Sequence, residues 1–291
     1  MENLCILCPR NCAVDRTKSK GYCNQGMLKV ARASLHKWEE PIISGTRGSG
    51  TVFFSGCNLK CVYCQNYEVS RGKGKAITTN ELADVFKKLE DLGAHNVNLV
   101  TPTHFVDDII KACDIYKPSI PIAYNCGGYE SQKTLERLKD VVDIFIPDFK
   151  YSDNSLAKKY SNCTNYFEIC TKAIVKMRQL CPHDVIEDGI MKRGMIIRHL
   201  VLPNALDNTK GVIDWLAYNL PKDTYFSLMG QYVPFGEANK FPKINRKLKP
   251  LEYKIAINHA LKQGLENTFI QSLDSANEEF IPDFDDKCLI Y

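Results

Sequence analysis

The sequence lacks a long hydrophobic run, a strong excess of one charge and an internal repeat. No apolar stretch approaches the ~20 residues that cross a bilayer, so we expect no transmembrane helix. The first residues carry Glu2 and no sustained apolar region, which argues against a secretory signal peptide. The 38 Lys and Arg against 34 Asp and Glu leave a formal charge of +4, too balanced to indicate a nucleic-acid or membrane-surface partner. We therefore expect a cytoplasmic protein that binds neither nucleic acid nor membranes.

The rest of the composition is typical of a globular protein, with one exception. Hydrophobic residues make up 44% and charged residues 25% of the sequence, which disfavours disorder, collagen-like repeats and coiled coil. The exception is cysteine, of which there are thirteen. An odd number of cysteines in a long chain of this kind is explained better by metal or redox chemistry than by a disulfide framework.

The cysteines divide the sequence into two parts. They concentrate at 5–23 and 57–64, and a connector rich in glycine runs over 32–50. This arrangement predicts a small Cys-rich lobe with its connector over 1–50 and a larger domain over 51–291.

In the larger domain, short apolar runs alternate with segments of helical periodicity. Strand patterns cover 51–55, 96–100, 120–124, 141–146, 195–202, 224–228 and 268–271. Helical patterns cover 80–92, 106–116, 131–139, 165–180, 210–219 and 251–262. The alternation predicts an α/β fold with parallel strands, arranged as a doubly wound sheet or as a full or partial (β/α) barrel. Both architectures place ligands at the carboxyl ends of the strands.

Three cysteines follow the first strand of the larger domain. Cys57, Cys61 and Cys64 have C-x3-C-x2-C spacing and come directly after the apolar run 51–55. Structural zinc sites and closed iron–sulfur clusters use four protein ligands, so three close thiolates indicate a metal centre with one open position. The spacing alone leaves zinc with three thiolates as an alternative.

The same cysteines carry a family resemblance. Cys57, Cys61, Tyr63 and Cys64 match the motif C-x3-C-x-aromatic-C. The sequence resembles the radical S-adenosylmethionine (SAM) enzymes, and within them the pyruvate formate-lyase activating enzyme-like iron–sulfur proteins. The resemblance extends to the segments 99–104, 124–128, 146–150, 197–203 and 271–274. It implies a partial (β/α)6 barrel of radical SAM type with a small N-terminal Cys-rich metal-binding lobe.

The resemblance also implies a reaction. A [4Fe-4S] cluster would be held by Cys57, Cys61 and Cys64, with its fourth iron chelated by SAM. One electron from the reduced cluster would cleave SAM to a 5'-deoxyadenosyl radical that abstracts hydrogen from a substrate. The protein has to place these cofactors and exclude water. A flavodoxin- or ferredoxin-type protein is the expected reductant.

Several residues at predicted strand ends resemble SAM contacts of the activating enzymes. Asp148 and Lys150 lie on one face of a strand and match an Asp-x-Lys element, in which Lys150 would neutralise the SAM carboxylate. Arg198 matches a SAM-binding arginine whose guanidinium suits carboxylate or ribose oxygens. An ordinary ion pair among these charges is the alternative interpretation.

The sequence departs from the family pattern at three other strand ends. Thr101 and Thr103 stand where many members have Gly-Gly-Glu, so hydroxyl groups would have to accept hydrogen bonds from SAM. Asn125 matches the Asp-Thr-Asn-Gly region imperfectly, and a role in a turn explains it equally well. Gln231 stands near the place of a SAM-contacting histidine. These residues and Tyr63 complete the predicted cofactor-binding set.

Four cysteines in the N-terminal lobe form a second candidate metal site. Cys5, Cys8, Cys12 and Cys23 supply enough thiols to close a tetrahedral zinc site or a second iron–sulfur cluster. The spacing does not choose between them, and unligated thiols or two disulfides are the alternative. A lobe of this size has little apolar surface, so a bound metal would supply much of its folding free energy.

The sequence therefore predicts a radical SAM enzyme that reductively cleaves SAM. Its preferred substrate is a glycine of a protein, as in the activation of a glycyl-radical enzyme, and this preference rests on the resemblance alone. The alternatives are a radical SAM reaction on another peptide or a small molecule, and a non-catalytic iron–sulfur or zinc protein.

Overall fold

The computed structural model of the chain describes residues 4–273 and residue 284. At its centre is one sheet with the strand order β10-β9-β8-β6-β5-β4-β2-β1-β3, and β7 pairs with β8. The strands that run parallel are β2 (Ser49–Phe54), β4 (Val97–Val100), β5 (Ile122–Cys126), β6 (Ile144–Pro147), β8 (Ile190–Leu200), β9 (Tyr225–Met229) and β10 (Thr268–Ile270).

These parallel strands settle which of the predicted architectures is present. Each parallel strand pairs with the next one along the chain, from β2 to β10. A doubly wound sheet would reverse its strand order at a switch point, and this sheet does not. The fold is therefore a partial (β/α) barrel, one of the architectures that the strand–helix alternation left open and the one that the family resemblance implies.

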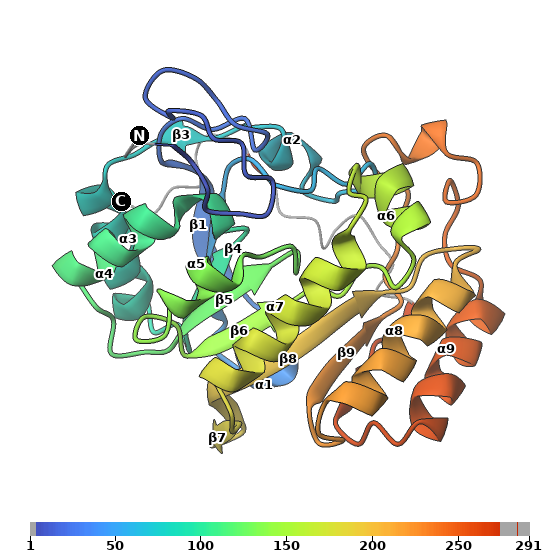
Figure 1. Cartoon of the computed structure of the whole chain (residues 1–291). Coiled ribbons are helices and arrows are strands. Elements are labelled where there is room, and N and C mark those ends of the chain that lie inside the picture. Colours follow the sequence, from blue (N-terminus) through green and yellow to red (C-terminus); the bar gives the residue numbers. More distant parts are fainter. Residues whose placement is uncertain (1–3, 274–283, 285–291) are drawn as a thin grey trace.

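Helices cover the outer face of the sheet (Figure 1). The predicted ones are present as α3 (Thr79–Asp91), α4 (Val106–Ile115), α5 (Gln132–Glu136), α7 (Tyr166–Leu180), α8 (Leu206–Asn219) and α9 (Pro250–Lys262). The start of α3 shows how local sequence fixes an element. Thr78 Oγ1 accepts a hydrogen bond from the Glu81 amide at 3.2 Å, and the Glu81 carboxylate accepts one from the Thr78 amide at 2.7 Å. This reciprocal capping box satisfies two amides that the helix itself cannot pair.

The structure contains several elements that the sequence did not predict. They are β1 (Lys29–His36), α1 (Pro41–Ser44), α2 (Tyr67–Ser70), β3 (Lys75–Ala76), α6 (Asn154–Ser161) and β7 (Val185–Glu187). β1 pairs antiparallel with β2 and therefore belongs to the main sheet. The connector assigned to the lobe by the sequence thus contributes a strand to the barrel sheet.

The core has an outer and an inner part. The outer part lies between the sheet and its helices, with side chains such as Phe86 and Ile174 that are fully buried. The inner part lies inside the barrel, where Ile43 of α1 packs with Ala123, Ile144, Ile146 and Ile196. α1 belongs to the connector between the lobe and β2, and it therefore fills part of the barrel interior (Figure 1).

The N-terminal lobe, residues 4–28, lies over the carboxyl ends of the parallel strands (Figure 1). Arg10 fastens it there, because its guanidinium donates to the carbonyls of Asn58 at 2.8 Å, Asn162 at 2.7 Å and Ser161 at 3.2 Å. Within the described residues, no helix is long and apolar enough to cross a membrane.

Candidate functional site

The loop with Cys57, Cys61 and Cys64 leaves the carboxyl end of β2 beneath the N-terminal lobe. Gly56 begins it with a φ of +85°, and a Cβ there would lie 2.4 Å from the Cys23 carbonyl oxygen. Only glycine combines this backbone conformation with such a close approach. The thiols receive hydrogen bonds, from the Leu59 amide to Cys57 Sγ at 3.3 Å and from Ser161 Oγ to Cys61 Sγ at 2.9 Å. The loop therefore presents its sulfurs in a defined arrangement.

These three thiols fit an iron–sulfur cluster with one open iron. Burial, together with the charges of Cys61 and Cys57, raises the pKa of Cys64 to about 12, and Lys150 opposes this rise. The Cys57 and Cys61 thiols therefore lie close enough to Cys64 to affect its ionisation, and so does the Lys150 ammonium group. Thiolates are the metal-binding form, and a bound cationic cluster supplies the charge that stabilises them. In the part of the chain that the structure describes, no three His, Cys, Asp or Glu side chains are arranged to hold a single metal ion.

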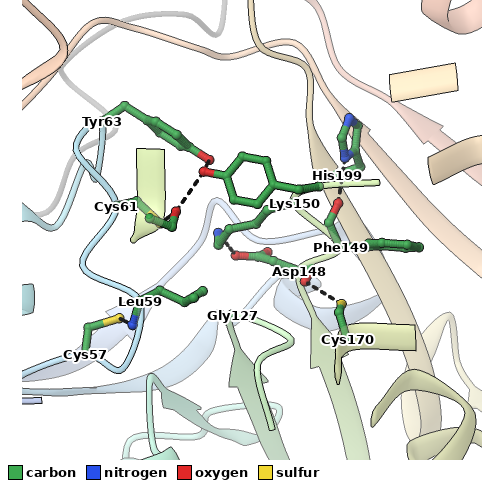
Figure 2. Close-up of polar contacts among 12 residues, drawn as sticks. Cys57, Leu59, Cys61, Tyr63, Gly127, Asp148, Phe149, Lys150, Cys170 and His199 are labelled. Carbon is green, nitrogen blue, oxygen red and sulfur yellow. Dashed lines mark hydrogen bonds and ion pairs between the residues drawn. The ribbon is translucent and has the colours of Figure 1, made fainter. Parts of the chain in front are cut away.

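Asp148 and Lys150 lie beside this loop at the end of β6 (Figure 2). Lys150 Nζ lies 2.5 Å from Asp148 Oδ2, and both side chains are mostly buried. Burial by itself would lower the pKa of Lys150, but Asp148 and the Cys61 thiol hold it above the ordinary value. Lys150 is therefore a fixed positive charge next to the cysteine loop, as the sequence predicts for a group that meets a carboxylate.

Tyr63 joins a chain of hydroxyl groups that ends on Cys61 (Figure 2). Its hydroxyl lies 2.8 Å from that of Tyr151, and Tyr151 lies 2.8 Å from Ser161 Oγ. Ser161 in turn donates to Cys61 Sγ. The aromatic residue of the motif therefore positions a cysteine through its neighbours. Ser161 and Tyr151 are site residues that the sequence analysis missed. Ser161 is the last residue of α6, a helix that the sequence did not predict.

Arg198 lies inside the barrel with two carboxylates from the connector. Its Nε donates to Glu40 Oε1 at 2.9 Å, and its terminal nitrogen contacts both Glu39 and Glu40. Glu39 also accepts a hydrogen bond from Asn98 Nδ2 at 3.1 Å. Asp148 is the β-bridge partner of Arg198, so this buried charge cluster reaches the Asp148–Lys150 pair. The sequence alone contains no signal for the two glutamates, because they precede Pro41 in what looks like an ordinary connector.

Thr101 and Thr103, both predicted to contact SAM, have different hydrogen-bond partners in the structure. Thr103 Oγ1 donates to Glu130 Oε1 at 2.7 Å, and Tyr124 donates to Glu130 Oε2 at 3.0 Å. Thr103 is thus engaged on the outer side of the sheet by a buried carboxyl that the sequence analysis missed. Thr101 has a φ of +59°, and its amide donates to the Asn125 carbonyl at 2.8 Å.

Asn125 and Gln231 follow their strands at the same end of the barrel. Asn125 is the fourth residue of β5 and is half-buried. Gln231 comes two residues after the end of β9 and is also half-buried. Both positions are compatible with the predicted cofactor contacts, which stay predictions. Of the segment 271–274, the last residue, Asp274, lies outside the described residues.

The four cysteines of the lobe also come together. Cys8 lies within electrostatic reach of Cys12 and Cys23, and Cys23 within reach of Cys5 and Cys12. All cysteines in the described ranges are free thiols, so the structure contains no disulfide among them. The lobe therefore keeps four free thiols, and among the described residues no three of them are arranged to hold a metal ion, so the predicted second metal site stays a prediction.

A comparison with protein families identifies this arrangement. A family model described as the radical SAM superfamily matches residues 51–200, just over half of the chain. The chain belongs to this superfamily. Radical SAM enzymes use a [4Fe-4S] cluster and SAM, and these are therefore the cofactors of this protein. That Cys57, Cys61 and Cys64 hold the cluster stays a prediction.

Two relatives of this radical SAM protein are similar in sequence. An uncharacterised protein of Methanocaldococcus jannaschii is 32% identical over 273 residues, which cover 90% of this chain and 75% of the relative. The pyruvate formate-lyase-activating enzyme of Clostridium pasteurianum is 30% identical over 122 residues, which cover 39% of this chain and 50% of that enzyme.

Solved radical SAM structures share the fold. Streptococcus suis SuiB bound to S-adenosylmethionine matches with a TM-score of 0.52 and 14% identity, over 77% of this chain and 50% of SuiB. The hydrogenase maturase HydG of Carboxydothermus hydrogenoformans matches with a TM-score of 0.51 and 16% identity, over 78% of this chain and 55% of HydG. The chain thus spans about half the length of these two proteins. At such identities the likeness establishes the fold and not the substrate.

Proposed function

We propose that this radical SAM enzyme abstracts a hydrogen atom from a glycine of a protein partner, as a glycyl-radical activating enzyme does. The observation that carries the proposal is the Asp148–Lys150 pair beside Cys61, a match to the Asp-x-Lys element of the activating enzymes. The partial sequence identity to the Clostridium pasteurianum activating enzyme supports the same subclass. A flavodoxin- or ferredoxin-type reductant and a glycyl-radical enzyme are the proposed partners.

The residues of the chain have distinct tasks in this proposal. Cys57, Cys61 and Cys64 bind the cluster, and Ser161 holds Cys61 by its hydrogen bond. Lys150 pairs with the carboxylate of SAM, because it is a mostly buried cation beside the cysteine loop.

The cofactors supply the radical chemistry, and the fold controls access to it. When bound, the cluster and SAM provide one electron and a 5'-deoxyadenosyl radical for hydrogen abstraction. The lobe and α6 cover the cysteine loop, because Arg10 ties them both to it. Such a cover keeps water away from a reactive site.

A product assay tests whether the protein cleaves SAM as an enzyme. Anaerobically reconstituted protein is mixed with SAM and dithionite, and 5'-deoxyadenosine and methionine are measured. We expect both products from the wild type, neither from Cys61→Ala, and both from Cys113→Ala, which removes a buried thiol on α4 as a matched control. An intact cluster that gives no product would favour an electron carrier over an enzyme.

A second assay tests the substrate. The protein is incubated with SAM, a reductant and a glycyl-radical enzyme encoded in the same genome, and the partner is examined by electron paramagnetic resonance. We expect the doublet of a glycyl radical. If 5'-deoxyadenosine forms and the partner gains no radical, the substrate is another peptide or a small molecule, and the activating function is refuted.

A further inference from the structure

Cys61 stands at the end of a chain of hydroxyl groups in the protein interior (Figure 2). Ser161 Oγ lies 2.9 Å from Cys61 Sγ and 2.8 Å from the Tyr151 hydroxyl. The Tyr63 hydroxyl lies 2.8 Å from that of Tyr151. All four side chains belong to buried residues. Because water is kept away from the chain, each of its hydrogen bonds is stronger than the same bond would be in water.

Main-chain contacts hold the Ser161 hydroxyl beside the thiol. The amide of Val62, the residue after Cys61, donates to the Tyr160 carbonyl of α6 at 2.9 Å. Arg10 donates to the Ser161 carbonyl at 3.2 Å. The cysteine loop and the end of α6 therefore stay together through bonds that use neither the Ser161 nor the Cys61 side chain.

A metal-bound Cys61 would fix the direction of every proton in the chain. The thiolate is the form that binds a metal, and a thiolate has no proton to donate. Ser161 must then donate to Cys61 Sγ, so its oxygen accepts the proton of Tyr151. Tyr151 in turn accepts from Tyr63. All three hydroxyl groups therefore point their protons toward the sulfur, and each bond strengthens the next.

A chain with this direction favours the reduced form of an iron–sulfur cluster. Reduction adds one electron, and hence one negative charge, to the cluster. A donor at a ligand sulfur stabilises the more negative state more strongly, and hydrogen bonds to the sulfurs are among the factors that set cluster potentials. The electron comes from the flavodoxin- or ferredoxin-type reductant of the proposed function, and the hydroxyl protons stay on their oxygens.

We propose that Ser161, Tyr151 and Tyr63 form a positioning chain that raises the reduction potential of the cluster bound at Cys61. Ser161 is the direct donor, and the two tyrosines act through it. Any aromatic ring satisfies the family motif at position 63, whereas this chain needs the Tyr63 hydroxyl. The proposal rests on the ligation of the cluster by Cys61 in the proposed function, and it does not depend on the substrate.

A redox titration followed by electron paramagnetic resonance measures the potential without turnover. Anaerobically reconstituted proteins are reduced stepwise in the absence of SAM. At a fixed solution potential, the ratio of reduced to oxidised cluster should fall about tenfold in Ser161→Ala, which corresponds to about 59 mV for one electron. Tyr151→Phe should lower the ratio less, and Tyr63→Phe least, because both keep the Ser161 hydroxyl. Ser161→Thr, which also keeps a hydroxyl, should stay near the wild type.

Ser70→Ala is the matched control. Ser70 is buried and follows the cysteine loop, and its hydroxyl donates to the Tyr67 carbonyl at 2.7 Å. The variant therefore loses a buried serine hydrogen bond that does not end on a thiol. We expect it to keep the potential of the wild type.

The titration separates this proposal from the one on which it rests. Wild-type potentials in both Ser161→Ala and Tyr151→Phe would overturn the hydrogen-bond chain, and so would an equal fall in Ser70→Ala. If Ser161→Ala fails to assemble a cluster, Tyr151→Phe decides alone. A Cys61→Ala variant that keeps its cluster would instead refute the ligation by Cys61.

Discussion

Arg198 illustrates at the residue scale how buried charges are arranged in this barrel. The side chain of Arg198 is 9% exposed, and those of Glu39 and Glu40 are 12% and 4% exposed. Charges removed from water to this extent persist only when they are paired and hydrogen-bonded. The connector therefore supplies the counter-charges of a strand residue that the sequence alone suggested as a SAM contact.

Replacement of Arg198 tests this arrangement. Arg198→Ala removes the cation that pairs with two buried carboxylates, so we expect the free energy of unfolding to fall by about 3–5 kcal/mol. Urea denaturation measures the loss, and the double variant Arg198→Ala/Glu40→Gln should recover part of it. If Arg198→Ala weakens SAM binding and leaves stability unchanged, the guanidinium serves the cofactor and not the connector.

Glu130 is a second buried acid, and it predicts a pH dependence. Burial raises its pKa from the ordinary 4.5 to about 7, although Thr103 and Tyr124 donate hydrogen bonds to it. The folded state thus keeps a proton that the unfolded state loses at lower pH. Stability from this group is therefore greatest below about pH 4.5 and declines as the pH rises through about 7.

Glu130→Gln removes this titration and conserves the shape of the side chain. Between about pH 5.5 and pH 8.5 the wild type should lose about 2 kcal/mol of unfolding free energy relative to the variant. Urea denaturation at both pH values measures the difference. A difference between the two proteins that is constant with pH would show that Glu130 does not titrate in this range.

At the scale of elements, α1 makes the connector part of the barrel. Ile43 is 0% exposed and packs inside the barrel with Ile144, Ile146 and Ile196. Since the connector also forms β1, the chain enters the sheet before residue 50 and returns through the barrel interior. The connector thus supplies Ile43 to the apolar packing inside the barrel and Glu39 and Glu40 to the charged cluster of Arg198.

Ile43→Ala tests this role of α1. Deleting a fully buried side chain leaves a cavity, so we expect a loss of about 2–5 kcal/mol in unfolding free energy. Ile115→Ala, at a position 55% exposed on α4, should change stability by less than about 0.5 kcal/mol. Equal small effects of both variants in urea denaturation would mean that α1 is not packed in the barrel.

At the scale of the whole molecule, the candidate site lies between the barrel and the N-terminal lobe. The barrel supplies Cys57, Cys61, Cys64 and Lys150 from segments that follow its strands. The N-terminal lobe lies over the carboxyl ends of these strands (Figure 1). Arg10 is the main link, because its three hydrogen bonds reach both the cysteine loop and the end of α6. A lobe fixed in this way can exclude water from the site.

Much of the fold could be predicted from the sequence because its signals are local. Period-two and helical patterns located the parallel strands and the six main helices, and the capping box of Thr78 and Glu81 lies within one helical turn. β1, α1 and α6 were missed. α6 is short and mixed in polarity, and its start depends on Asp153, whose carboxylate accepts from the Ser155 amide at 2.7 Å.

The sequence by itself determined the cysteine loop, the strand–helix alternation and the Asp148–Lys150 pair, since each depends on residues close together along the chain. Only the tertiary structure decided which residues pair with Arg198 and where the N-terminal lobe lies. Arg198 and Glu40 are 158 residues apart, and Arg10 and Asn162 are 152 apart. Contacts at such separation form when the barrel folds and desolvates the charges, and no local pattern records them.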